Sequence, residues 1–177
     1  MSEQSVDVKH GQQLAPGLIG MSVHTDCVYL QEINRANLPE GAEPQVSSIK
    51  MVLQAIDFGQ LIADIKTGRQ GEAETSIRQA LAAVQRAGVD FLVVTANTVS
   101  AMLDDMPDAV SVPVLDITKA VFAAAREQGL SRLGLLSTSQ TAKSGLYQDR
   151  AAEFGCSVIT PPPGIAEAID EAIFQRL

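Results

Sequence analysis

The sequence alternates short apolar runs with longer amphipathic stretches, and this alternation constrains the fold more than any other feature. Phe91-Leu-Val-Val94 is wholly apolar and lies between turn residues, which is typical of a strand buried in a parallel sheet. Residues 72–87 carry apolar side chains at helical spacing and end before Gly88, and glycine commonly ends helices. The alternation predicts an α/β fold, a parallel sheet in a three-layer αβα arrangement.

The expected strands are residues 17–21, 48–56, 91–94, 112–115, 133–136 and 156–159. The expected helices are residues 25–35, 58–66, 72–87, 118–128, 142–154 and 165–177, with Thr25 or Asp26 as the N-cap of the first. A chain of 177 residues has room for one domain or for two small lobes. We interpret residues 1–14 as a flexible leader, 15–116 as a first α/β lobe and 117–177 as a partial second α/β lobe, because the alternation stops where a further strand is expected.

Charge and composition exclude several classes of partner. Thirteen Lys and Arg residues against 21 Asp and Glu give a formal net charge of -8, which disfavours nucleic acids and anionic membranes. The aromatic content is 4%, without tryptophan, so base-stacking surfaces are not expected. No apolar run approaches the roughly 20 residues that cross a bilayer. Two cysteines and a polar first segment without a signal-peptide core predict a cytoplasmic protein with reduced thiols.

Small polar residues follow three of the expected strands. They are Gly20-Met21-Ser22, Thr95-Ala96-Asn97-Thr98 and Ser137-Thr138-Ser139-Gln140-Thr141. Ligands of open α/β sheets bind at the carboxyl ends of strands, where N–H and hydroxyl groups can hold a small anion such as a carboxylate. The alternative interpretation is that each segment only caps a helix.

Residues suited to catalysis are few. His10 falls in the leader, and His24 is the only other histidine, which leaves little material for a catalytic triad or a metal site. His24 and Cys27 lie three residues apart at the start of the first helix, where the helix dipole can lower the pKa of a thiol; a packed cysteine and a surface histidine are the alternative. Cys156 is expected in the core. The chain has no phosphate-binding glycine motif, so we expect no nucleotide cofactor.

Several segments together resemble the aspartate/glutamate racemase family, within the Asp/Glu/hydantoin racemase superfamily. They are Gly17-Leu-Ile-Gly-Met-Ser22, Tyr29-Leu-Gln-Glu-Ile-Asn34, Ala55-Ile-Asp-Phe58, the run from Arg86 to Val94 leading into Asn97-Thr98, Val112-Pro-Val-Leu-Asp-Ile117, Gly134-Leu-Leu-Ser-Thr138, Ser144-Gly-Leu-Tyr-Gln-Asp-Arg150 and Val158-Ile-Thr-Pro161. The resemblance runs from about residue 16 to Leu177. It implies two similar lobes, with the second incomplete in this sequence, and an amino-acid isomerase that works without cofactor or metal as a homo-oligomer, most simply a dimer.

The resemblance also implies a site. Family members use two thiols on opposite faces of the substrate α-carbon, because racemisation must remove a proton from one side and return one to the other. By resemblance, Asn97, Thr98, Thr138 and Thr141 bind the α-carboxylate, and the Met21-Ser22 loop closes one wall.

The sequence departs from the family pattern at the proton carriers. Ala96 occupies the position of the first catalytic cysteine, and a methyl group carries no proton. Ser100 and Ile65 stand where the family has a histidine-like residue and a residue that binds the distal carboxylate. The family's second cysteine would lie beyond Leu177, and neither Cys27 nor Cys156 matches either thiol.

Three interpretations remain open from the sequence. The first is a racemase-family protein that is impaired or inactive in this form, whether truncated or altered at Ala96. The second is a natural pseudoenzyme that binds a small carboxylate or amino acid, with a binding or regulatory role. The third is a structural subunit of a racemase-like oligomer.

Overall fold

The computed structural model describes residues 13–38, 41–43 and 46–176. Most of the predicted leader, with His10, lies outside the described residues. The chain forms two compact units. The first contains the described residues up to Ala96 together with Met106–Leu115, and the second contains Asn97–Asp105 and Asp116–Leu177. The predicted division into lobes 15–116 and 117–177 stays a prediction.

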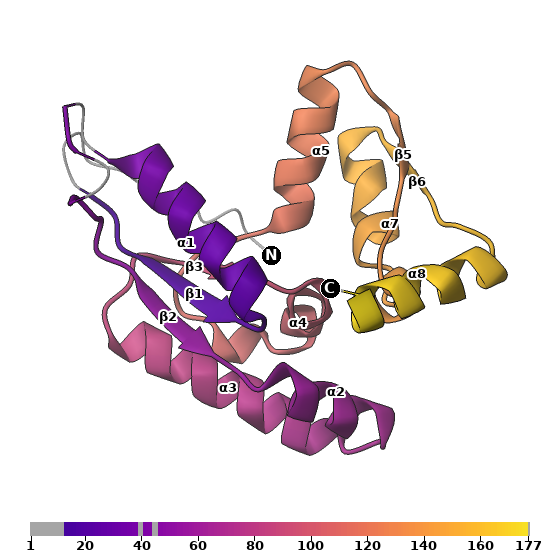
Figure 1. Cartoon of the computed structure of the whole chain (residues 1–177), viewed down its shortest axis with the longest axis horizontal. Helices are drawn as coiled ribbons and strands as arrows, with labels where there is room; N and C mark the ends of the chain where they lie inside the picture. The colour runs from indigo at the N-terminus through magenta and orange to yellow at the C-terminus, as the bar shows by residue number, and fades with distance from the viewer. Residues whose placement is uncertain (1–12, 39–40, 44–45, 177) are drawn as a thin grey trace. The chain divides into compact units, whose positions relative to one another are not determined.

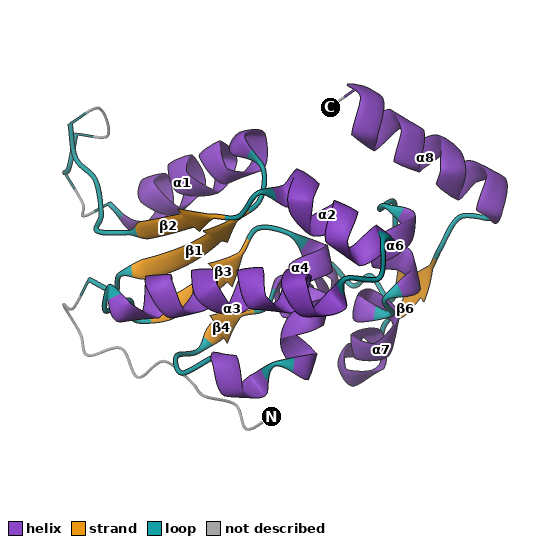
Figure 2. Cartoon of the chain, turned by 90° about the horizontal axis from the view of Figure 1, so that it is seen from below, coloured by secondary structure: helices purple, strands orange, loops and turns teal. Residues whose placement is uncertain are grey.

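The first unit is built on a four-stranded parallel sheet of order β2-β1-β3-β4. Strands β1, β2 and β3 are labelled in Figure 1, and β4 is labelled beside β3 in Figure 2. Its strands are β1 (Pro16–Gly20), β2 (Val52–Ala55), β3 (Phe91–Val94) and β4 (Val114–Leu115). All five residues of β1 are buried, as expected for a strand paired on both sides. Ile19 lies beside Gln54 of β2 and Val94 of β3, so the three strands end at one edge of the sheet.

Helices lie on both faces of this sheet (Figure 2). They are α1 (Val23–Asn37), α2 (Phe58–Lys66) and α3 (Gln70–Arg86), with a short 3-10 turn at Pro107–Ala109. The side chains of Ile77, Leu81 and Val84 on α3 are fully buried. The α/β class and the parallel sheet predicted from the sequence are confirmed, and the bounds of β3 and α2 are those predicted.

The second unit holds a smaller parallel sheet of two strands, β5 (Arg132–Gly134) and β6 (Ser157–Ile159). Its helices are α4 (Asn97–Met102), α5 (Ile117–Glu127), α6 (Ser139–Lys143), α7 (Leu146–Ala151) and α8 (Pro163–Arg176), with 3-10 turns at Leu103–Asp105 and Ala152–Phe154. The core consists of Phe122, Leu146, Tyr147 and Ala151. Phe122 stacks on Phe154 with ring centroids 5.6 Å apart.

Most other predicted elements differ from the structure in their bounds, and three of the differences affect the elements near the predicted site. The expected helix 142–154 is broken between α6 and α7, because Gly145 adopts a left-handed conformation with φ of 75°, which ends a helix. The expected strand 48–56 pairs with β1 only over Val52–Ala55. The N-cap of α1 is Ser22, not Thr25 or Asp26, since the helix begins at Val23.

We predict that Gly17→Ala destabilises the protein by about 1–3 kcal/mol, because cores tolerate added methyl groups poorly. A Cβ at Gly17 would lie 2.3 Å from Cγ1 of Val84 and 2.9 Å from Cγ2 of Val89. Gly71→Ala on α3 is the matched control, since a Cβ there meets nothing within 4 Å and alanine favours helix. Urea unfolding should show the loss only for Gly17→Ala; equal stabilities would contradict this packing.

Candidate functional site

The segment after β1 forms the first predicted part of the site. Met21 is buried, and its N–H donates to Oδ1 of Asp26 at 3.3 Å. Ser22 is exposed in extended conformation, and its side chain makes no capping hydrogen bond. Its carbonyl accepts the N–H of Asp26 at 2.8 Å. The Ser22 hydroxyl is therefore not used to cap α1, whereas the Met21 N–H already has an acceptor within the protein.

Asp26 is the residue of this segment whose role was missed by sequence reasoning. Its side chain is only 5% exposed, and its Oδ1 also accepts the Thr95 hydroxyl at 2.7 Å. Gly20 leaves room for it, since a Cβ on Gly20 would lie 2.4 Å from Oδ2 of Asp26. The carboxylate thus ties the end of β1 to the residue that follows β3. A polar residue on an amphipathic helix gives no local sign of such a contact.

The helix α1 carries further polar groups that the sequence singled out. His24 and Cys27 are both exposed on it, and their predicted joint chemistry stays a prediction. Burial raises the pKa of the Tyr29 hydroxyl above its ordinary value, so this group is protonated at neutral pH.

In the second unit, Asn97 and Thr98 open helix α4. Thr98 is buried, and Asn97 is half-buried. Oδ1 of Asn97 accepts a hydrogen bond from the Tyr147 hydroxyl on α7 at 3.1 Å. Ala96, the residue directly before Asn97, is half-buried and offers only a methyl group. Ser100 lies one turn further along α4 and is half-buried, while Ile65 lies on α2 of the first unit.

Thr138 and Thr141 are joined to each other at the start of α6. Oγ1 of Thr138 accepts the Thr141 N–H at 3.3 Å and donates to the Thr141 hydroxyl oxygen at 3.2 Å. Thr141 is 4% exposed. Thr138 is the N-cap of α6. The alternative interpretation from the sequence, that this polar segment caps a helix, is therefore confirmed for Thr138. The adjacent N–H of Ser139 donates to Oδ1 of Asp170 on α8 at 2.7 Å, so a carboxylate of the chain itself lies at this turn.

Helices α4, α6 and α7 contact one another within the second unit. Asn97 and Thr98 therefore lie on a helix that neighbours the one carrying Thr138 and Thr141. Met21 and Ser22 belong to the first unit, and their part in the site stays a prediction.

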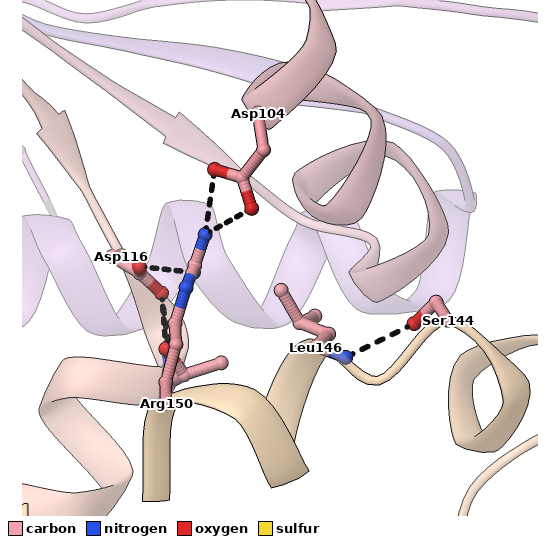
Figure 3. A network of polar contacts seen from close by, with 6 residues as sticks. Asp104, Asp116, Ser144, Leu146 and Arg150 are labelled. Carbon is pink, nitrogen blue, oxygen red and sulfur yellow. Dashed lines mark hydrogen bonds and ion pairs between the residues drawn. The ribbon is translucent and has the colours of Figure 1, made fainter. Parts of the chain in front are cut away.

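A charged network fixes the far end of α4. Figure 3 shows the Arg150 guanidinium of α7 between Asp104 and Asp116. One of its nitrogens donates to both Asp104 oxygens, at 2.7 and 2.6 Å. The second terminal nitrogen, Nη1, donates to Oδ2 of Asp116 and to the Thr118 hydroxyl. Asp116 also caps α5 by accepting the Thr118 N–H at 2.8 Å. One arginine thus joins three segments of the unit.

The two cysteines are free thiols that are not joined by a disulfide. Cys27 is an exposed free thiol, whereas Cys156 is a half-buried one that packs against the core of the second unit.

Within the described ranges, no three His, Cys, Asp or Glu side chains are grouped so that they could hold a metal ion. The same residues include no helix with the length and apolar character to span a membrane.

Comparison with known proteins places the chain in a family. The model of the Asp/Glu/Hydantoin racemase family matches residues 18–176, and the chain therefore belongs to that family. Over an aligned stretch of 80 residues, the chain is 38% identical to the glutamate racemase of Thermus thermophilus. That match covers 43% of this chain and 30% of the racemase, less than a third of its length.

Solved structures agree with this assignment. A protein from Yersinia pestis assigned as an Asp/Glu racemase has a TM-score of 0.78 and 30% identity, over 92% of this chain and 71% of its own. An aspartate racemase homologue from Pyrococcus horikoshii has a TM-score of 0.72 and 24% identity, over 93% of this chain and 72% of its own. The likeness to the Pyrococcus protein, at 24% identity, shows that the two chains share a fold.

We predict that Arg150→Met destabilises the protein by about 2–3 kcal/mol, because it leaves a half-buried carboxylate without its partner. The side chains of Arg150 and Asp116 are only 18% and 16% exposed. Arg35→Met is the matched control, since Arg35 and its partner Glu32 are 73% and 58% exposed and such pairs contribute little. Urea unfolding at low salt measures both; a loss of equal size in the two variants would refute the structural role of Arg150.

Proposed function

We propose that this racemase-family chain binds a small carboxylate, an amino acid or a dicarboxylate, and does not interconvert its stereoisomers. The observation that carries this proposal is Ala96, which directly precedes Asn97 and Thr98. Racemisation needs an acid/base group on each face of the α-carbon, and a methyl group can neither remove nor return a proton. Loss of this one group is sufficient to prevent two-base catalysis, whatever supplies the other face.

The donors that support carboxylate binding lie in the second unit. The Asn97 amide and the hydroxyls of Thr98 and Thr141 are neutral hydrogen-bonding groups, and fixed donors of this kind stabilise a carboxylate without a full counter-charge. Thr138, whose hydroxyl donates to Oγ1 of Thr141, is assigned to the site by family resemblance. Met21 and Ser22 are assigned to the site by family resemblance. The proposal includes no cofactor and no metal. The family that the chain resembles uses neither for its two-base proton transfer.

The relatives support an amino-acid ligand. The Thermus protein is named a glutamate racemase and the Yersinia protein an Asp/Glu racemase. Because the match spans only 30% of the Thermus enzyme, the activity and substrate of the whole protein are proposals for this chain. Aspartate, glutamate and succinate, which is aspartate without its amino group, are the first compounds to test.

The proposed absence of racemase activity is tested by incubating the protein with L- or D-aspartate and with L- or D-glutamate in heavy water. Chiral chromatography should show no inversion, and proton NMR should show no exchange of the α-proton above the solvent background. Ala96→Cys restores one thiol, yet we expect no inversion by this variant, because neither Cys27 nor Cys156 corresponds to the second thiol. Inversion by the unaltered chain would refute the proposal.

Ligand binding is tested separately by thermal unfolding. A ligand that binds only the folded state at 100 times its Kd stabilises it by about 2.7 kcal/mol, so Tm should rise with at least one of these compounds. Thr141→Val should remove most of this rise. Thr75→Val, at an exposed residue of α3, should retain it. If none of the compounds raises Tm, the chain does not bind this class of ligand.

We further propose that the protein associates with itself, most simply as a dimer. A parallel sheet is normally covered on both faces, yet Leu136 after β5 and Ile159 on β6 are 77% and 44% exposed. Light scattering should give about twice the mass of 18.8 kDa, and Ile159→Lys should reduce it to that of one chain. Val46→Lys, at a residue 80% exposed in the first unit, is the control. A wild-type protein with the mass of a single chain would contradict dimerisation.

We also propose a cytoplasmic location, on the ground that both cysteines are free thiols and that Cys27 is exposed. An exposed thiol persists best in a reducing compartment. Titration of the protein, isolated under non-reducing conditions, with a thiol reagent should find both cysteines free, and an intermolecular disulfide through Cys27 would argue against this location.

A further inference from the structure

The side-chain amide of Asn97 has its two ends in different environments. Its Oδ1 accepts the Tyr147 hydroxyl at 3.1 Å, whereas its Nδ2 forms no hydrogen bond within the part of the chain that the structure describes. An asparagine amide has an acceptor end and a donor end. A phenol hydroxyl can donate or accept, and here it donates to Oδ1 and so holds the amide with its oxygen toward Tyr147. The NH₂ end is the one left for a ligand, and it is a donor, as a carboxylate requires.

Tyr147 is itself held in place by the core. Its side chain is 9% exposed, and its ring meets that of Phe122 edge-on, with centroids 6.2 Å apart and an interplanar angle of 70°. A ring packed in this way has one available position for its hydroxyl, so little side-chain entropy is lost when the hydrogen bond forms.

The helix that carries Tyr147 is fixed at a second point. Arg150 lies three residues further on, so the two side chains leave α7 from neighbouring positions of one face. Tyr147 binds the first residue of α4, and Arg150 binds Asp104 in the 3-10 turn that follows α4. Helix α7 thus holds both ends of the segment from Asn97 to Asp104. These contacts hold the residue for which sequence and family resemblance predict carboxylate binding.

We propose that Tyr147 is a positioning residue that orients the Asn97 amide so that Nδ2 donates to the ligand carboxylate. The inference rests on the proposed function, because it concerns the same carboxylate site. Tyr147 does not touch the ligand and acts only through Asn97. It differs from a structural core residue in that its hydroxyl, and not only its ring, contributes to ligand affinity.

The first test compares Tyr147→Phe, Asn97→Ala and the double variant by calorimetric titration with L- and D-aspartate, L- and D-glutamate and succinate. Loss of one neutral hydrogen bond corresponds to a fall in affinity of about threefold to tenfold for Tyr147→Phe. Asn97→Ala should lose about tenfold or more, and the double variant should be no weaker than Asn97→Ala alone. Tyr29→Phe changes the only other tyrosine and should bind as the wild type does. Additive losses in the double variant would overturn the proposal.

The second test needs no ligand and so separates this inference from the proposed function. The Nδ2 proton resonances of Asn97 are assigned in ¹⁵N-labelled protein by their absence from Asn97→Ala. Tyr147→Phe should shift or broaden them, because the amide is then free to turn over, while Tyr29→Phe should leave them unchanged. If no compound binds the wild type but the resonances respond, the proposed function fails and the positioning contact stands. If they do not respond to Tyr147→Phe, the positioning role is refuted.

Discussion

Parallel pairing of β1 on both of its sides is the constraint on which the first unit depends. Because β1 is buried and lies between β2 and β3, these strands must end at the same edge of the sheet. Two glycines make this packing possible. Gly17 admits Val84 of α3 on one side, and Gly20 admits the Asp26 carboxylate at the end of the strand. The hydrogen bond from Thr95 to Asp26 then fixes the residue before Ala96 relative to β1.

The second unit depends more on polar links than on a large sheet. Its two strands are short, and its small core of Phe122, Leu146, Tyr147 and Ala151 places α7 at the centre. Tyr147 and Arg150 project from this helix to opposite ends of the segment that begins at Asn97. The groups expected to bind a carboxylate are therefore held by buried contacts, as a preorganised donor site requires. We propose that binding and chemistry are separable in this site, because the donors would remain where Ala96 stands in place of a proton carrier.

The sequence predicted what local patterns encode. The apolar run of β3 and the amphipathic α2 were predicted with their observed bounds, and the strand–helix alternation gave the fold class. The break between α6 and α7 was missed because Gly145 interrupts a pattern that is otherwise helical. Long-range contacts had no local signal: Asp26 and Thr95 are 69 residues apart, and Asn97 and Tyr147 are 50 apart. Family resemblance and the polar segments after three strands predicted the ligand residues, which stay a prediction, while the hydrogen-bond partners of these residues required the three-dimensional structure.

The central claim is that the chain keeps a carboxylate site while lacking two-base chemistry. The most direct measurement is a residue-resolved NMR titration of ¹⁵N-labelled protein with L-aspartate and L-glutamate, in which the ligand is recovered afterwards and its configuration determined. The account predicts saturable shifts centred on Asn97, Thr98, Thr138 and Thr141, with the ligand recovered unchanged. Shifts confined to other parts of the chain, or recovery of the D-enantiomer, would contradict it.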